Sequence, residues 1–192
     1  MGPFRSALAR GSDREASRSA LHDLTRRGRY FDLFGTVMFG DGLRFDNPYR
    51  LSHQLGKSGE SLSQTAPYVD LAVAATTGQP DGLQHGARLG WTLSVSGVPQ
   101  QVITPSYLAL VRLAPAWLVY GWAGLPILLE PDVNVGGELA IGGSWLARAG
   151  LGATMALVAD GFYGAGTADT RAAFYPVLSA QVGLFVAYEV LP

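Results

Sequence analysis

The sequence predicts an all-β protein, an eight-stranded antiparallel up-and-down transmembrane β-barrel. Three observations lead to this prediction: an apolar composition, eight segments of alternating polarity, and short connections that alternate with longer ones. Of the 192 residues, 48% are hydrophobic and only 15% are charged, whereas about a quarter of the residues in a typical soluble domain are charged. The composition therefore favours a membrane environment.

The first alternating segment, residues 30–39, shows two faces of different character. Phe31, Leu33 and Val37 share one parity, and Asp32 and Thr36 share the other. Successive side chains of a strand point to opposite faces, so this alternation predicts a strand. Across the segments, the second face carries small residues and single charges, too sparse for a solvated exterior. An apolar face towards lipid and a narrow lumen explain both faces.

Further segments of this kind follow along the chain. They are residues 68–76, 83–96, 102–113, 117–126, 134–148, 151–160 and 174–190. In segment 117–126 the parity is ambiguous, and we favour Leu118, Tyr120 and Trp122 on the lipid side.

The connections between these segments differ in length in a regular way. Residues 78–81, 114–116 and 149–150 form short links, while 40–65, 127–133 and 161–173 form longer ones, with 97–101 as an exception. Alternate connections of an up-and-down barrel emerge at the same end. The short links therefore predict a periplasmic end and the long links an outer end.

Residues 1–29 form a separate region, which we expect to be a poorly packed basic tail. Seven of the fourteen basic residues fall there. A short helix that begins at Ser12 or Asp13 is the alternative, because Glu15 gives capping-box spacing. The tail has no apolar run of a secretory signal, so a signal lies upstream of an internal start or there is none.

From Tyr30 to Pro192 the chain resembles the small eight-stranded outer-membrane β-barrels of Gram-negative bacteria, of the opacity-protein and outer-membrane-protein-A transmembrane-domain type. The resemblance rests on the eight segments, the asymmetry of the connections and the last strand, which runs to Val190. It implies a bacterial outer-membrane location, contact with lipopolysaccharide and phospholipid, and assembly by the barrel-assembly machinery. Family members usually end in an aromatic residue that helps assembly; this chain ends Leu191-Pro192, with Tyr188 as the nearest substitute.

Inward parity predicts a network of charged side chains in the lumen. Its members are Asp32, Asp70, Arg88, Arg112, Glu138, Arg148 and Glu189, with Asp160 at the same parity. Folding the second segment onto the third about residue 79 places Asp70 opposite Arg88, and we predict that this pair touches. Unpaired ions in so confined a space are costly, so we interpret the network as structural packing that closes the lumen; a narrow pore is the alternative.

The first outer connection holds candidates for surface contacts, namely Phe45, Tyr49, Arg50 and His53. We expect a structural or surface-interaction role without catalysis. One alternative is a lipid A-modifying enzyme with a Ser/His site in this connection, since such enzymes pair a nucleophile with a base. The connection offers Ser52, His53, Ser58, Glu60, Ser61 and Ser63. Another is a helical inner-membrane protein with residues 106–129 as a spanning helix.

Other classes of function find little support in the composition. The chain has no Cys, three scattered His and a net charge of −1. We therefore expect no metal site, no cofactor and no nucleic-acid partner.

Overall fold

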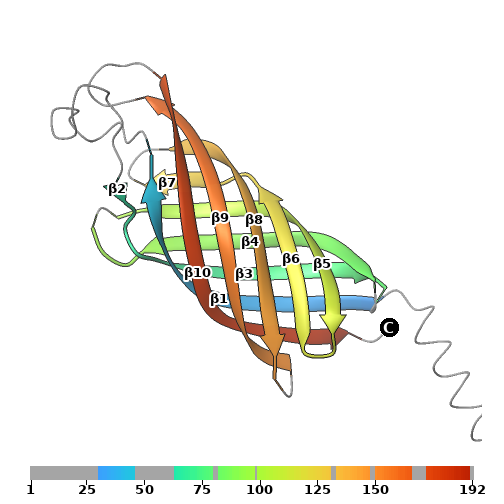
Figure 1. Ribbon diagram of the computed structural model, residues 1–192. Helices are drawn as coiled ribbons and strands as arrows, with labels where there is room; N and C mark the ends of the chain where they lie inside the picture. Colours follow the sequence, from blue (N-terminus) through green and yellow to red (C-terminus); the bar gives the residue numbers. More distant parts are fainter. Residues whose placement is uncertain are drawn as a thin grey trace, which may run out of the picture.

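The computed structural model describes residues 30–45, 63–79, 82–97, 99–130, 133–147, 150–165 and 172–190. Within them the chain forms one closed antiparallel β-barrel of eight long strands and two short ones (Figure 1). The long strands are β1 (Tyr30–Arg44), β3 (Tyr68–Gly78), β4 (Leu83–Ser94), β5 (Gln101–Ala114), β6 (Trp117–Gly124), β8 (Asn134–Leu146), β9 (Leu151–Ala165) and β10 (Ala172–Val190). Pairing of β1 with β10, from Phe31↔Val190 to Arg44↔Val177, closes the barrel. The predicted fold class is confirmed.

The two short strands lie in connections for which the sequence predicts loops. β2 (Ser63–Gln64) pairs with the end of β1, and β7 (Ile127–Glu130) pairs with β5 and β8. The expectation of a plain loop over 127–133 is therefore wrong. Ile103 pairs with Ile127 in the same register as Ser106 with Gly124, so β7 continues β6 beyond a break. Pro126 lies in that break and cannot donate a ladder hydrogen bond.

The helical alternative for residues 106–129 is also wrong. This part of the chain forms most of β5, then β6 and β7. Among the described residues, no helix is both long enough and apolar enough to cross a membrane.

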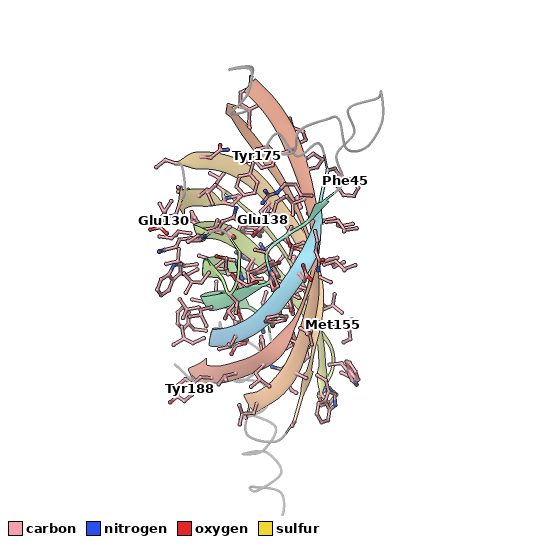
Figure 2. The ribbon with its side chains drawn as sticks, turned by 90° about the vertical axis from the view of Figure 1, so that its left-hand side faces the viewer. Phe45, Glu130, Glu138, Met155, Tyr175 and Tyr188 are labelled. Atoms are coloured by element: carbon pink, nitrogen blue, oxygen red, sulfur yellow. The ribbon has the colours of Figure 1, made fainter. Side chains whose placement is uncertain are left out.

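The outer surface of the barrel is apolar around its circumference. Met155, Val182 and Leu139 are 67%, 62% and 65% exposed, and Figure 2 shows Met155 pointing away from the barrel. Apolar side chains on the exterior of a closed sheet have no protein partner, so a hydrocarbon environment accounts for them.

Aromatic side chains gather on this surface near both ends of the barrel. Those near the short connections are Phe31, Trp117, Trp145 and Tyr188, and those near the long connections are Phe45, Tyr163 and Phe174. Two such girdles flank the apolar band of membrane barrels. The exterior therefore identifies β1–β10 as a transmembrane barrel.

Strand β6 corrects one assignment of faces. Leu118, Tyr120 and Trp122 are 1%, 7% and 5% exposed and face the lumen, whereas Trp117 and Val119 face outwards. Both parities of this segment are apolar, so alternation could not decide between them. Inside the barrel the Tyr120 hydroxyl and the Trp122 indole N–H find hydrogen-bond partners in Thr154 and Glu138. Lipid would leave both groups unpaired.

Candidate functional site in the barrel lumen

The predicted contact between Asp70 and Arg88 is confirmed. The two side chains form an ion pair, with 3% and 6% of each exposed. The predicted register is wrong, because Asp70 lies opposite Thr92, and Arg88 lies opposite Ala74. The long Arg88 side chain crosses this offset over Gly90, where a Cβ would stand only 2.6 Å from an Arg88 guanidinium nitrogen.

The ion pair belongs to a chain of contacts across the lumen. Thr92 Oγ1 donates to Asp70 Oδ2 at 2.9 Å. On its other side, the Arg88 guanidinium carbon lies 4.4 Å from the centroid of the Trp122 ring, close enough for a cation–π interaction. Trp122 in turn donates its indole N–H to Glu138. One cation is thus held between a carboxylate and an aromatic face.

Glu138 and Asp160 are neighbours on the adjoining strands β8 and β9. They occupy directly paired positions of the ladder, and both face the lumen. Among the described residues, neither carboxyl group has an Arg or Lys within ion-pair distance. Two acidic side chains therefore meet on one wall of the lumen, where they hydrogen-bond to each other.

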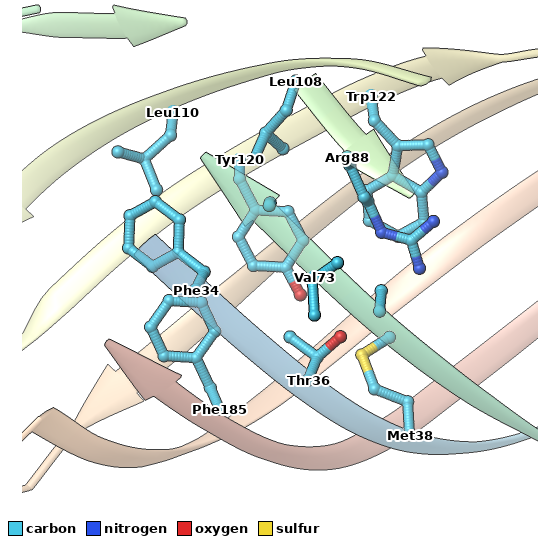
Figure 3. Close-up of a pocket in the computed structure, with 12 residues that line it drawn as sticks. Phe34, Thr36, Met38, Val73, Arg88, Leu108, Leu110, Tyr120, Trp122 and Phe185 are labelled. Carbon is cyan, nitrogen blue, oxygen red and sulfur yellow. The ribbon is translucent and has the colours of Figure 1, made fainter. Parts of the chain in front are cut away.

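Towards the short connections, the lumen is filled by an apolar layer. It consists of Phe34, Met38, Leu108, Leu110, Leu118, Tyr120, Trp122, Ala156, Val158 and Phe185. Figure 3 shows the Phe34 and Phe185 rings side by side, with their centroids 5.2 Å apart. The void left in this layer has a volume of about 30 Å³, close to the volume of one water in the liquid. We call these ten residues the apolar plug.

Towards the long connections, the lumen widens into a cavity of about 360 Å³, which we call the outer cavity. Glu138 and Asp160 line it together with Tyr68, Tyr175 and Arg44. Figure 2 shows Tyr175 near that end of the barrel and Glu138 further inside. The lumen thus has a closed half and a hollow half.

Tyr68 braces one side of the outer cavity. Its hydroxyl donates to Ser179 Oγ at 2.8 Å and accepts from Gln181 Nε2 at 3.1 Å, so it links β3 to β10 across β1. The ring passes directly over Gly40, where a Cβ would lie 2.3 Å from the Tyr68 Cζ. Gly40 therefore lets the aromatic ring lie flat on the strand between.

The other predicted site residues are scattered. Asp32 is buried near the short connections, and Arg112 is partly buried at the same end beside a bulge in β5. Phe45 is 39% exposed, and its backbone N–H donates to the Pro176 carbonyl at 2.9 Å, so it joins the outer girdle. The tail 1–29, Tyr49, Arg50, His53, Arg148 and the side chain of Glu189 lie outside the described part of the chain.

Sequence reasoning missed the aromatic and hydroxyl members of the lumen network. The sequence favours the wrong face for Trp122, and Thr92 and Tyr68 are not among the expected site residues. The spacing of Trp122 from Glu138 in two consecutive long strands is the one signal that could have linked them. It depends on a register that the interrupted connection through Pro126 conceals.

No protein-family model and no curated protein matches the chain. Among solved structures, it is similar to Ail, the attachment invasion locus protein of Yersinia pestis, with a TM-score of 0.52 and 8% sequence identity, over 84% of this chain and 100% of that one. Neisserial surface protein A gives a TM-score of 0.46 at 12% identity, over 82% and 97%. The outer membrane protein OprG from Pseudomonas aeruginosa gives 0.43 at 11%, over 84% and 96%. At these identities the likeness to Ail supports the barrel fold alone.

The closed sheet, its apolar exterior and the two aromatic girdles together define the class of protein. The chain is a small eight-stranded β-barrel membrane protein whose lumen contains the apolar plug and the outer cavity. The outer cavity and the side chains that line it are the candidate functional site.

Proposed function

We propose that this chain is a barrel of the bacterial outer membrane with a closed lumen and a structural or surface-interaction role in the cell envelope. The single observation that carries the proposal is the apolar plug, ten buried side chains that pack together inside the barrel towards the short connections. On this proposal the girdled exterior contacts phospholipid and lipopolysaccharide, and the barrel-assembly machinery inserts the chain.

Two layers in series oppose permeation. An ion that enters from the outer cavity meets first the Asp70–Arg88 pair, whose charges already compensate each other. It then meets the plug, whose remaining void is about the size of one water. Interiors of eight-stranded barrels are just wide enough for side chains to fill, and here they are filled by packed apolar groups.

The proposal includes no catalytic step. The enzyme alternative depends on Ser and His side chains of the first outer connection, and its one histidine, His53, lies outside the described residues. Two hydroxyls of the lumen have neighbours of another kind: Ser144 donates to Thr154, and Thr92 donates to Asp70. Neither arrangement places a nucleophile beside a histidine base, as lipid acyl transfer by a Ser–His site requires.

Planar-bilayer conductance tests whether the lumen is closed. We expect the purified full chain to insert without stable ohmic steps, and we expect Trp122→Ala to gain brief openings because it removes both the plug's largest side chain and the partner of Arg88. Trp117→Ala is the matched control, since it removes a tryptophan from the lipid face. Steady conductance of the wild-type chain would establish a channel and refute the plug.

Mass spectrometry of lipid A tests the absence of turnover. Cells that express the wild-type chain and cells that express His53→Ala should give identical lipid A spectra. A mass shift that appears with the wild-type chain and disappears with the variant would replace the structural role by an enzymatic one.

A further inference from the structure

We propose that the outer cavity binds a small organic cation, an ammonium group carried on an apolar or aromatic body. The inference stands on the chemistry of the cavity wall and does not depend on the proposed role in the envelope. The proposed site is the part of the lumen that the described side chains do not fill.

The size of the cavity suits a small molecule. Its volume is about 360 Å³, within the range of roughly 300–1,000 Å³ typical of ligand sites. The plug beneath it has a void of only about 30 Å³. Because the plug closes the inner side, a ligand enters and leaves at the outer end.

The acidic and amide side chains on the cavity wall favour a ligand that donates hydrogen bonds and carries positive charge. Glu138 and Asp160 face the cavity side by side, and Arg88 is already compensated by Asp70. Two buried acceptor atoms on this wall, Asp160 Oδ1 and Gln181 Oε1, have no hydrogen-bond partner among the described residues. Gln181 is only 7% exposed. Buried acceptors without partners are uncommon in folded proteins, and an ammonium group bound beside either atom would supply the missing donor.

The remainder of the wall accommodates an apolar body. Phe162 and Tyr175 stack with their ring centroids 5.6 Å apart, and Val102, Leu128 and Val177 complete the lining. Aromatic faces also attract cations. The guanidinium of Arg44 uses this property already, since its carbon lies 5.7 Å from the centroid of the Tyr175 ring.

Charge separates the organic cation from other ligands. Arg44 is the only basic side chain that lines the cavity in the described part of the chain, and it lies at the last position of β1, near the mouth. Its Nε is a buried donor without a hydrogen-bond partner among the described residues. The deeper wall is acidic, so an anion is repelled there and a neutral molecule leaves the carboxylates without a counterion. Two carboxylates also provide too few oxygens for a calcium site, which takes six to eight.

The test is binding by the full chain, refolded in an uncharged maltoside detergent, measured by isothermal titration calorimetry with phenethylammonium. We expect saturable binding that phenethyl alcohol and phenylpropionate do not reproduce. Glu138→Gln and Asp160→Asn should each weaken binding about tenfold or more, the order expected for losing a charge-assisted hydrogen bond. Glutamine at 138 keeps an acceptor for the Trp122 indole, and heat-modifiable gel migration verifies that each variant is folded.

Glu130→Gln is the matched control, because it removes an exposed carboxylate at the same end of the barrel but outside the cavity lining. It should bind phenethylammonium like the wild-type chain. The proposal is overturned if the wild-type chain shows no saturable binding, if phenethyl alcohol binds equally well, or if both cavity variants bind unchanged. Saturable binding of Ca²⁺ alone, lost in those variants, would identify a metal site instead.

Discussion

The buried ion pair between Asp70 and Arg88 supplies the sharpest energetic prediction. Both side chains are almost completely buried, so removing one partner leaves a charge in the lumen without its counterion. Such a change costs about 3–5 kcal/mol. Arg88→Gln should have the larger effect of the two single substitutions, because it also removes the cation from the Trp122 face, a further contribution of about 0.5–2 kcal/mol.

The double variant Asp70→Asn with Arg88→Gln distinguishes pairing from general packing. It leaves no ion, and the two amides can bond to each other and to Thr92. Its loss in unfolding free energy should therefore fall short of the summed single losses by about 2 kcal/mol or more. The assay is equilibrium unfolding by guanidinium in phospholipid vesicles, followed by heat-modifiable gel migration.

The exposed Glu130 again offers a control for charge alone. Glu130→Gln should change the unfolding free energy by less than about 0.5 kcal/mol. Additive losses in the double variant, or single losses no larger than that of the control, would refute the view that the lumen depends on this pair.

Two further pairs of substitutions test the close approach of Tyr68 over β1 and the lipid-facing surface. Gly40→Val should lower the unfolding free energy by about 1–3 kcal/mol, because its side chain would occupy the place of the Tyr68 ring; Gly35→Val on the same strand meets no atom within 4 Å of its Cβ and should be tolerated. Equal effects of the two would rule out the steric explanation. In vesicles, Val182→Arg should cost about 2–4 kcal/mol near the bilayer midplane, whereas Tyr188→Arg in a girdle should cost about 0–1 kcal/mol. The reverse order of these two costs would place the membrane elsewhere on the barrel.

The sequence was sufficient for the strands in which one parity carries polar residues. In β1, β4 and β10 the predicted outward residues, such as Val37, Leu89 and Val182, are the exposed ones. The reason is physical: a charge such as Asp32 or Arg88 excludes its parity from hydrocarbon. Alternation then fixes the orientation of every other side chain in the strand.

Strand β6 shows where this reasoning fails. Trp117 and Val119 on one parity are as apolar as Leu118 and Tyr120 on the other. The choice between the faces is made by hydrogen bonds to Thr154 and Glu138 on other strands. Such partners become visible only when the register of several strands is known.

The sequence predicted which charged side chains face the lumen, but it did not predict the outer cavity. Parity placed Asp70, Arg88, Glu138 and Asp160 inside the barrel. The first two meet because the long Arg88 side chain spans an offset of four residues, which the turn length did not predict. The outer cavity could not be predicted, because its existence depends on where bulky inward side chains end. The bulky inward side chains end between the apolar plug and the ring of Tyr68. This boundary is set by packing among side chains of several strands.

The most direct test of the alternating faces is a scan of single cysteines along β10, from Leu178 to Phe185. The chain contains no Cys, so each introduced thiol can carry one spin label, and the accessibility of the label to oxygen and to a water-soluble nickel complex can be measured in vesicles. We expect oxygen accessibility to rise at Leu178, Val182 and Leu184 and to fall at Ser179 and Phe185, with a period of two. Accessibility without this period, or strong access of the nickel complex at Val182, would contradict a lipid-facing exterior.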